Sequence, residues 1–473
     1  MNRIKNSNLL LAEAMIRQIM KECDACGMAA AIVDKEGGTL YENFFGYADR
    51  DAQKDLNEDT VFGLASVTKS FTALSVMQLE EAGILSIEDP VNKYIPEYTG
   101  FNQPSVTIGN FLNHSGGFFP LPRILVGEVA KNLGLEERSC GDFAYNTRIA
   151  EEGARLVSER LDAQTFENRG LNGMPGRHFS YCNDGYGLLS EIIRREGPEP
   201  SYADYLKRHI LDPLHMDRSF CDFLRPSLDD NAATLYKRVN GTMVGSRDYH
   251  DNAFVLNGGG AMKSTLGDMK KYLCLYLNGG KTRKGERLLS EYRMGEMCRP
   301  RQPYLADGYY GYGLCLKQLD DLKVFGHGGS LPGVSSHMAW SREAEAGVII
   351  LCNTSDVPVS LISDALMRVY NGKSPVDSRD RYQETPWSLK TVEAAAGIYE
   401  SGEGTRIEIL KQEDGTPGVK ENGVLKPLVP INPHAGFVRN TFTDNYLYLH
   451  RTENNGIDAI TYQSRMIPRV FPV

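Results

Sequence analysis

Residues 62–98 contain the helix pattern that most constrains the fold. From Ser66 to Ala82 the apolar side chains suit a helix that is mostly buried. Gly83 follows at once, and glycine is the residue that most readily ends a helix. The sequence therefore predicts a mostly buried helix that begins at Ser66.

Ser66 and Lys69 lie three positions apart at the head of this helix. Residues with that spacing share one face, so the hydroxyl and the amine can touch. A serine becomes a nucleophile when a neighbour removes its proton, and a buried, partly neutral lysine can do so. Free N–H groups at the helix start would stabilise an anionic intermediate. Alone, the S-x-x-K spacing favours a capping serine beside a surface lysine, because short motifs often occur by chance.

The composition indicates a globular protein. Of the 473 residues, 41% are hydrophobic and 24% are charged. No apolar run approaches the roughly 20 residues that a membrane helix needs. The formal net charge of -9 gives no general attraction to nucleic acid or anionic lipid. We therefore expect neither a nucleic-acid nor a membrane partner, and the charge favours a small neutral or cationic partner.

The amino-terminal residues resemble a secretion signal only superficially. Glu13 and Arg17 interrupt the apolar run, and Leu9, Ala12 and Ile16 fall at helical spacing, so we expect an amphipathic first helix and a cytoplasmic protein. Nine cysteines, an odd number, fit reduced thiols better than disulfides. The lone C-x-x-C has no second pair, and we expect no metal or organic cofactor.

Hydrophobic patterns place strands at both ends of one large unit. Two strands joined by a turn are expected over 28–49, and neighbouring strands over 324–340 and 345–355. The last segment is apolar enough to be central in its sheet. Helices fill the interval, with 146–161 the clearest. The pattern indicates one sheet closed by distant segments.

The composition changes after this unit. A polar stretch with two prolines is typical of a linker, and short strands with frequent turns follow it, which indicates a small β-barrel or sandwich. We therefore expect a catalytic domain over 1–373, a linker over 374–386 and a C-terminal β domain over 387–473.

Two further motifs bear on the chemistry of Ser66. Tyr181 and Asn183 lie two apart, so their side chains point the same way if the segment is extended. His327 precedes Gly328, Gly329 and Ser330 on a predicted strand, where glycines permit close approach of the backbone to a ligand. Taken singly, the first motif also fits a core aromatic beside a turn asparagine, and the second fits an ordinary glycine-rich turn.

Together, the three motifs resemble those of the serine β-lactamase and penicillin-binding protein superfamily, in which S-x-x-K, Y-x-N and K-T-G follow in that order. The similarity is closest to the class C β-lactamases and their esterase and D-aminopeptidase relatives, over roughly residues 25–370. It implies an α+β fold: an antiparallel sheet flanked by helices, with a helical subdomain. The tail resembles the lipocalin-like barrel of some of these proteins.

The resemblance implies an acyl-enzyme mechanism. Ser66 would attack a carbonyl, Lys69 would share or accept its proton, and Tyr181 would act as base and then as acid toward the leaving group. Asn183 would hydrogen-bond the substrate. The backbone N–H groups of Ser66 and Ser330 would form the oxyanion hole.

The third motif departs from the family pattern, because His327 replaces the usual lysine and Gly328 the usual threonine. Efficient β-lactam hydrolysis is therefore not expected. An imidazole is mostly neutral at pH 7, so carboxylate-bearing substrates should gain only as pH falls toward 6. His114, in "LNHSGG", is expected to be structural.

The sequence thus predicts a serine hydrolase that cleaves an ester or amide of a small molecule or short peptide, possibly as a homo-oligomer. An acyltransferase that uses the same acyl-enzyme stays open, and so does a penicillin-binding sensor that acylates and stalls.

Overall fold

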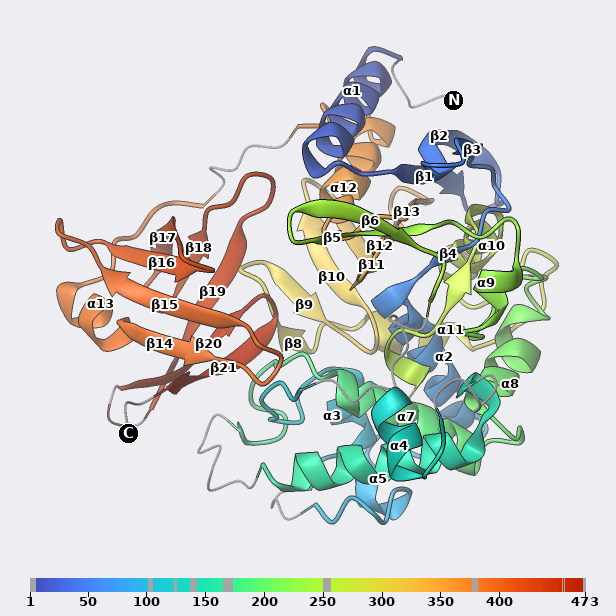
Figure 1. The fold of residues 1–473 in the computed structure, drawn as a ribbon, viewed down its shortest axis with the longest axis horizontal. Helices are drawn as coiled ribbons and strands as arrows, with labels where there is room; N and C mark the ends of the chain where they lie inside the picture. Colours follow the sequence, from blue (N-terminus) through green and yellow to red (C-terminus); the bar gives the residue numbers. More distant parts are fainter. Residues whose placement is uncertain are drawn as a thin grey trace.

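The computed structural model shows a helix-flanked sheet, a helical subdomain and a separate barrel (Figure 1). The residues it describes are 6–100, 105–122, 126–136, 143–164, 173–249, 257–376, 382–452, 454 and 456–470.

The central sheet is antiparallel and is closed by segments from opposite ends of the domain, as predicted. Its strands in spatial order are β3 (Lys54–Asp55), β2 (Thr39–Asp49), β1 (Gly27–Asp34), β13 (Ala346–Cys352), β12 (Val334–Ser341), β11 (Leu322–Leu331), β10 (Cys315–Leu319), β9 (Gly308–Tyr310) and β8 (Gln302–Pro303). β1 pairs with β13, with Met28 opposite Cys352. The predicted strand 324–340 is a hairpin, because Pro332 and Gly333 turn the chain between β11 and β12.

Helices cover both faces of the sheet, so alternate residues of β1 enter different cores. On one face pack α1 (Asn6–Cys23) and α12 (Val359–Tyr370), against Ala30 and Ile32. On the other, α10 (Leu266–Leu277) packs against β1, and α2 (Thr68–Glu81) belongs to the same core as Ala29 and Ala31. The amphipathic first helix is thereby confirmed. None of the helices in the described ranges is long and apolar enough to cross a membrane.

The helical subdomain lies below the sheet in Figure 1 and surrounds the far end of α2. Its helices are α3 (Ile108–Leu112), α4 (Val126–Asn132), α5 (Thr147–Asp162), α7 (Asn183–Glu196) and α8 (Tyr202–Leu206). Short elements complete the domain: β4 (Phe62–Gly63), β5 (Leu235–Val239), β6 (Thr242–Ser246), β7 (Lys263–Ser264), α9 (Arg225–Leu228) and α11 (Glu291–Cys298).

The C-terminal domain is a closed antiparallel barrel, which confirms the predicted all-β tail and selects the barrel over the sandwich. Its strands are β14 (Gly397–Glu400), β15 (Arg406–Lys411), β16 (Pro417–Glu421), β17 (Val424–Asn432), β18 (Ala435–Val438), β19 (Asn445–Arg451), β20 (Ile457–Tyr462) and β21 (Arg465–Val470). The short helix α13 (Leu389–Ala395) packs against β15. The domain limits 1–373, 374–386 and 387–473 stay a prediction.

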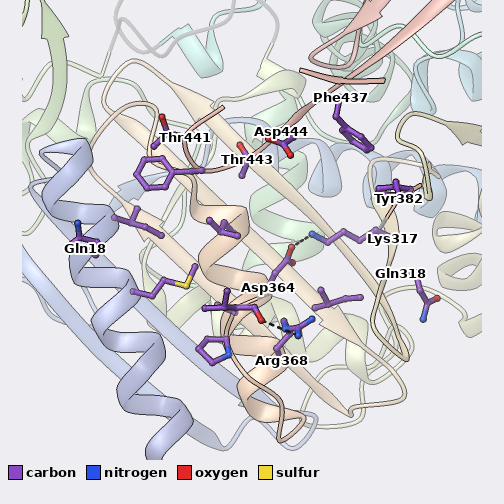
Figure 2. Close-up of a pocket in the computed structure, with 18 residues that line it drawn as sticks. Gln18, Lys317, Gln318, Asp364, Arg368, Tyr382, Phe437, Thr441, Thr443 and Asp444 are labelled. Atoms are coloured by element: carbon purple, nitrogen blue, oxygen red, sulfur yellow. Dashed lines mark hydrogen bonds and ion pairs between the residues drawn. The ribbon is translucent and has the colours of Figure 1, made fainter. Parts of the chain in front are cut away.

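A cavity of about 450 Å³ lies where the barrel meets α1 and α12 (Figure 2). Its charged groups are already paired: Lys317 with Asp364 at 2.5 Å, and Arg368 with Asp320 at 2.6 Å. None of the predicted catalytic residues lines it.

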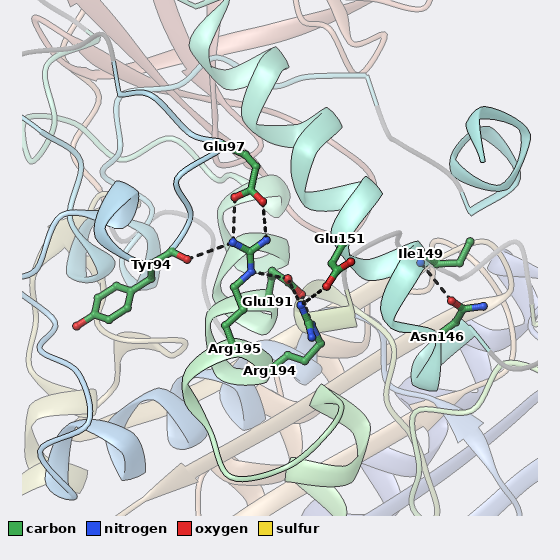
Figure 3. A network of polar contacts seen from close by, with 8 residues as sticks. All are labelled: Tyr94, Glu97, Asn146, Ile149, Glu151, Glu191, Arg194 and Arg195. Carbon is green, nitrogen blue, oxygen red and sulfur yellow. Dashed lines mark hydrogen bonds and ion pairs between the residues drawn. The ribbon is translucent and has the colours of Figure 1, made fainter.

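A network of charged side chains fixes α7 to its neighbours (Figure 3). Glu191, only 1% exposed, accepts hydrogen bonds from both Arg194 and Arg195, each at 2.7 Å. Arg195 also forms a two-bond contact with Glu97, both bonds 2.9 Å long. Arg194 reaches Glu151 on α5. Because α7 begins at Asn183, this network fixes the helix that carries one of the predicted site residues.

Glu191→Ala should lower the free energy of unfolding by about 3 kcal/mol, because it leaves two arginines without their shared buried carboxylate. Denaturant unfolding measures the change. Glu159→Ala is the control, since Glu159 pairs with Arg155 on the exposed surface of α5 and its removal should cost far less. Equal losses in the two variants would contradict the structural role given to Glu191.

Candidate active site

Ser66 and Lys69 come from consecutive elements rather than from one helix. Ser66 lies in a single 3₁₀ turn, Ala65–Val67, and α2 begins at Thr68. The prediction that the helix starts at Ser66 was therefore wrong by two residues. Ala65 has a φ of 47°, in the left-handed region that residues with a Cβ rarely adopt. Such strain often occurs at functional sites, where the surrounding packing maintains it.

The strand β11 fixes this turn from the other side. A Cβ at Gly329 would lie 2.2 Å from the carbonyl oxygen of Leu64 and 2.4 Å from Ser336 Oγ, so only glycine fits. Ser336 Oγ donates a 2.6 Å hydrogen bond to the same Leu64 oxygen. At Gly328 the nearest atom would be 3.4 Å away, an ordinary contact. The two glycines of the third motif therefore differ: Gly329 is required for packing, and Gly328 is not.

The Lys69 amine is completely buried, with 0% of its surface exposed. Its Nζ lies 3.3 Å from Ser66 Oγ and donates 2.8 Å hydrogen bonds to Asn183 Oδ1 and to the Gly259 carbonyl. Burial, and then the charge of Arg465, holds the pKa of Lys69 well below its ordinary value. A neutral amine has two hydrogens and one lone pair, which matches two acceptors and one hydroxyl.

Tyr181 is positioned by contacts on several sides. Its backbone N–H donates to the Ser464 carbonyl of the barrel at 2.9 Å. The ring of His114 lies 4.1 Å from its ring, centroid to centroid, and Lys69 Nζ lies 4.8 Å from the ring centroid. Burial raises the pKa of Tyr181, and a hydrogen bond to Ser66 opposes the rise. Tyr181 is therefore a neutral phenol beside Ser66.

His327 is also neutral, and both of its nitrogens are occupied. Nδ1 lies 2.6 Å from the Gly328 carbonyl and Nε2 lies 2.8 Å from the Tyr310 hydroxyl. Burial lowers the pKa of His327 to about 3. The expectation that His327 gains charge toward pH 6 was therefore wrong, because the side chain is inside the protein.

These residues surround one cavity of about 330 Å³. Ser66, Tyr181 and the segment His327–Ser330 line it, and Arg465 of the barrel does so as well. Asn183 reaches the site through Lys69. His114 packs behind Tyr181 and is completely buried, in keeping with a structural role. Among the described residues, no group of three or more His, Cys, Asp and Glu side chains could hold a metal ion.

Three contributors were missed by the sequence reasoning. The Gly259 carbonyl and the Tyr310 hydroxyl act through hydrogen bonds to Lys69 and His327, and neither belongs to one of the three motifs. Arg465 comes from a domain whose sequence indicated only strands and turns. A single arginine at the start of a strand, as Arg465 is in β21, carries no sequence signal.

The model of the beta-lactamase family, described as "Beta-lactamase", matches residues 12–369. The chain belongs to the beta-lactamase family. The resemblance to the serine β-lactamase and penicillin-binding protein superfamily, inferred from the three motifs, is therefore confirmed.

Named relatives and a solved structure agree with this family. The chain is 29% identical to Penicillin-binding protein 4* of Bacillus subtilis (strain 168) over 343 residues, 69% of this chain and 68% of that protein. It is 36% identical to Esterase EstB of Burkholderia gladioli over 195 residues, 40% of this chain and 46% of the esterase. The octameric penicillin-binding protein homologue from Pyrococcus abyssi superposes with a TM-score of 0.67 at 24% identity, over 97% of this chain and 99% of that one. The last similarity concerns the fold alone.

Gly329→Ala should displace the strand from the Ser66 turn, because the new Cβ overlaps two oxygens. We expect a loss of about 1–3 kcal/mol in unfolding free energy and a much slower reaction of Ser66 with a fluorophosphonate. Gly328→Ala is the matched control and should change both quantities little. If the two variants behave alike, the close contact at Gly329 does not position Ser66.

Proposed function

We propose that this member of the beta-lactamase family is a serine hydrolase that cleaves an ester or amide of a small molecule or short peptide through an acyl-Ser66 intermediate. The observation that carries the proposal is the buried Lys69 amine, whose two hydrogens have acceptors and whose third direction faces Ser66 Oγ at 3.3 Å. The penicillin-binding and esterase names of the relatives agree with acyl chemistry.

In the first half-reaction, Lys69 Nζ takes the proton of Ser66 as Oγ forms a bond to the carbonyl carbon. The negative oxygen of the intermediate is held by the backbone N–H groups of Ser66 and Ser330. Tyr181 gives its phenol proton to the departing oxygen or nitrogen as the carbon bond to it breaks. Lys69 then returns a proton to the Tyr181 oxygen, and both groups are neutral again.

In the second half-reaction, a water molecule enters where the leaving group was. Tyr181 takes the water proton as it passes its own phenol proton to Lys69, and the water oxygen attacks the acyl carbon. As the bond from that carbon to Ser66 Oγ breaks, Lys69 gives its extra proton to Oγ, and all three side chains are neutral again. An alcohol or amine in place of water gives acyl transfer. If no acceptor can enter, the protein acylates and stalls, as a penicillin-binding sensor would.

No metal or organic cofactor is needed by these steps. We retain a homo-oligomer as a prediction, because the Pyrococcus abyssi homologue is described as octameric. A cytoplasmic location likewise stays a prediction.

Ser66 should form one covalent adduct with a fluorophosphonate, and Ser66→Ala should abolish it. Intact-protein mass spectrometry measures the adduct. Turnover is then tested with p-nitrophenyl esters, D- and L-aminoacyl anilides and nitrocefin. Tyr181→Phe, which keeps the ring, should lower turnover by about 10²- to 10⁴-fold. An adduct that persists in Ser66→Ala would contradict the proposal, and an adduct without turnover would select the sensor.

The rate of Ser66 acylation should rise with pH through the pKa of Lys69, because only the neutral amine accepts the proton. Burial lowers that pKa, so the rise should occur well below the value of about 10.4 for free lysine. Labelling rates between pH 5 and pH 10 measure it. Arg465→Gln removes the positive charge that, after burial, lowers the pKa of Lys69. The increase in acylation rate should therefore occur at a higher pH in this variant. A rise at the pH of a free lysine would contradict the role of Lys69.

A further inference from the structure

The barrel contributes a hairpin tip to the active site. β20 and β21 pair through Tyr462 and Arg465, which leaves Gln463 and Ser464 as a two-residue turn. Their φ angles are 47° and 67°, both in the left-handed region, although neither residue is glycine. A type I′ turn requires positive φ at both central residues, so this is the geometry of a tight hairpin.

Two contacts connect this tip to Tyr181. The Ser464 carbonyl accepts the Tyr181 backbone N–H at 2.9 Å. The Arg465 guanidinium carbon lies 4.6 Å from the centroid of the Tyr181 ring, within the range of a cation–π contact. Ser464 and Arg465 also line the cavity that contains Ser66. A positive charge from the barrel therefore lies beside the residue proposed to protonate the leaving group.

Only some of the N–H donors of the Arg465 guanidinium are hydrogen-bonded to the described residues. Its Nε donates to Glu403 Oε2 at 2.9 Å, and its Nη1 donates to the Gln463 carbonyl at 3.3 Å. Its Nη2 has no hydrogen-bond partner within the described residues, and the side chain is 28% exposed. Glu403 thus fixes the direction of the guanidinium, while one edge of it stays available to a ligand.

The third motif cannot supply a positive charge for a carboxylate, because His327 is buried and neutral and both of its nitrogens are engaged. Among the described residues that line the cavity, Arg465 is the one Lys or Arg, and the exposed Asp356 carries the opposite charge. Within this lining, an anionic substrate group therefore finds its cationic partner in Arg465.

We propose that Arg465 binds a carboxylate on the leaving fragment, which departs from the acyl carbon as Tyr181 protonates it, so the barrel selects substrates whose leaving group, or whose acyl acceptor, carries that carboxylate. This inference rests on the proposed function. A guanidinium suits the task because it presents N–H groups in a planar fork that matches a carboxylate. Since the acceptor enters where the leaving group departs, the same contact would favour carboxylate-bearing acceptors.

Two esters that differ only in the leaving fragment test the proposal: 3-acetoxybenzoate, with a carboxylate, and 3-acetoxybenzamide, without one. The full-length protein should give a higher kcat/KM for the benzoate. Arg465→Gln should lower kcat/KM for the benzoate by about 10- to 100-fold relative to the benzamide, the effect of losing a hydrogen bond to a charged group. Taking the ratio cancels any shift in the Lys69 pKa, which affects both esters alike.

Two further variants separate recognition from a structural role. Glu403→Gln keeps an oxygen that can accept from Arg465 Nε but removes a competing negative charge, so the preference for the benzoate should increase. Arg406→Gln is the matched control, because Arg406 is an exposed arginine of the barrel, paired with Glu400, that does not line the cavity. It should leave the ratio unchanged. A ratio unaffected by Arg465→Gln, or one altered equally by Arg406→Gln, overturns the inference.

If the proposed function is wrong, the outcome differs, because Ser66→Ala then still hydrolyses both esters. If neither ester is turned over, calorimetric binding of 3-hydroxybenzoate and 3-hydroxybenzamide decides, since it needs no catalysis. Tighter binding of the benzoate that Arg465→Gln removes supports the inference, and equal binding of the two overturns it.

Discussion

The burial of one amine organises the active site. Moving a charged lysine out of water is costly, and Lys69 at 0% exposure can stay buried because it loses its proton readily and has acceptors for its remaining hydrogens. One acceptor, Asn183, begins α7, and the other, the Gly259 carbonyl, lies in the segment before β7. Satisfying Lys69 therefore brings together three segments that are far apart in the chain.

The motif residues were predictable because each carries its chemistry in its identity and local spacing. Ser66 and Lys69 are three positions apart, and their side chains lie within contact distance as expected. The Lys69 amine also donates a hydrogen bond to the Asn183 side chain. The sheet closed by β1 and β13 was also predictable, since both strands are continuous apolar runs. Such patterns predict structure well because they depend on residues that are close together in the sequence.

The remaining features of the site depend on contacts between segments that are far apart in the sequence, and no local pattern predicts such contacts. Ala65 has left-handed backbone in the turn before α2, which starts at Thr68, and β11 packs closely against this turn at Gly329. The neutrality of His327 follows from its burial beside Tyr310, and a pKa near 3 could not be inferred from an imidazole in a glycine-rich strand. Arg465 reaches the site only because the barrel docks beside Tyr181.

The hydrogen bond from Tyr181 to Ser464 also has a consequence for synthesis. Ser66, Lys69, Tyr181 and the His327 segment leave the ribosome long before the barrel hairpin that touches them. Until the barrel has folded, the nascent catalytic unit has an unsatisfied N–H at its tyrosine and lacks one wall of its cavity. The order of translation therefore delays completion of the site until both domains exist.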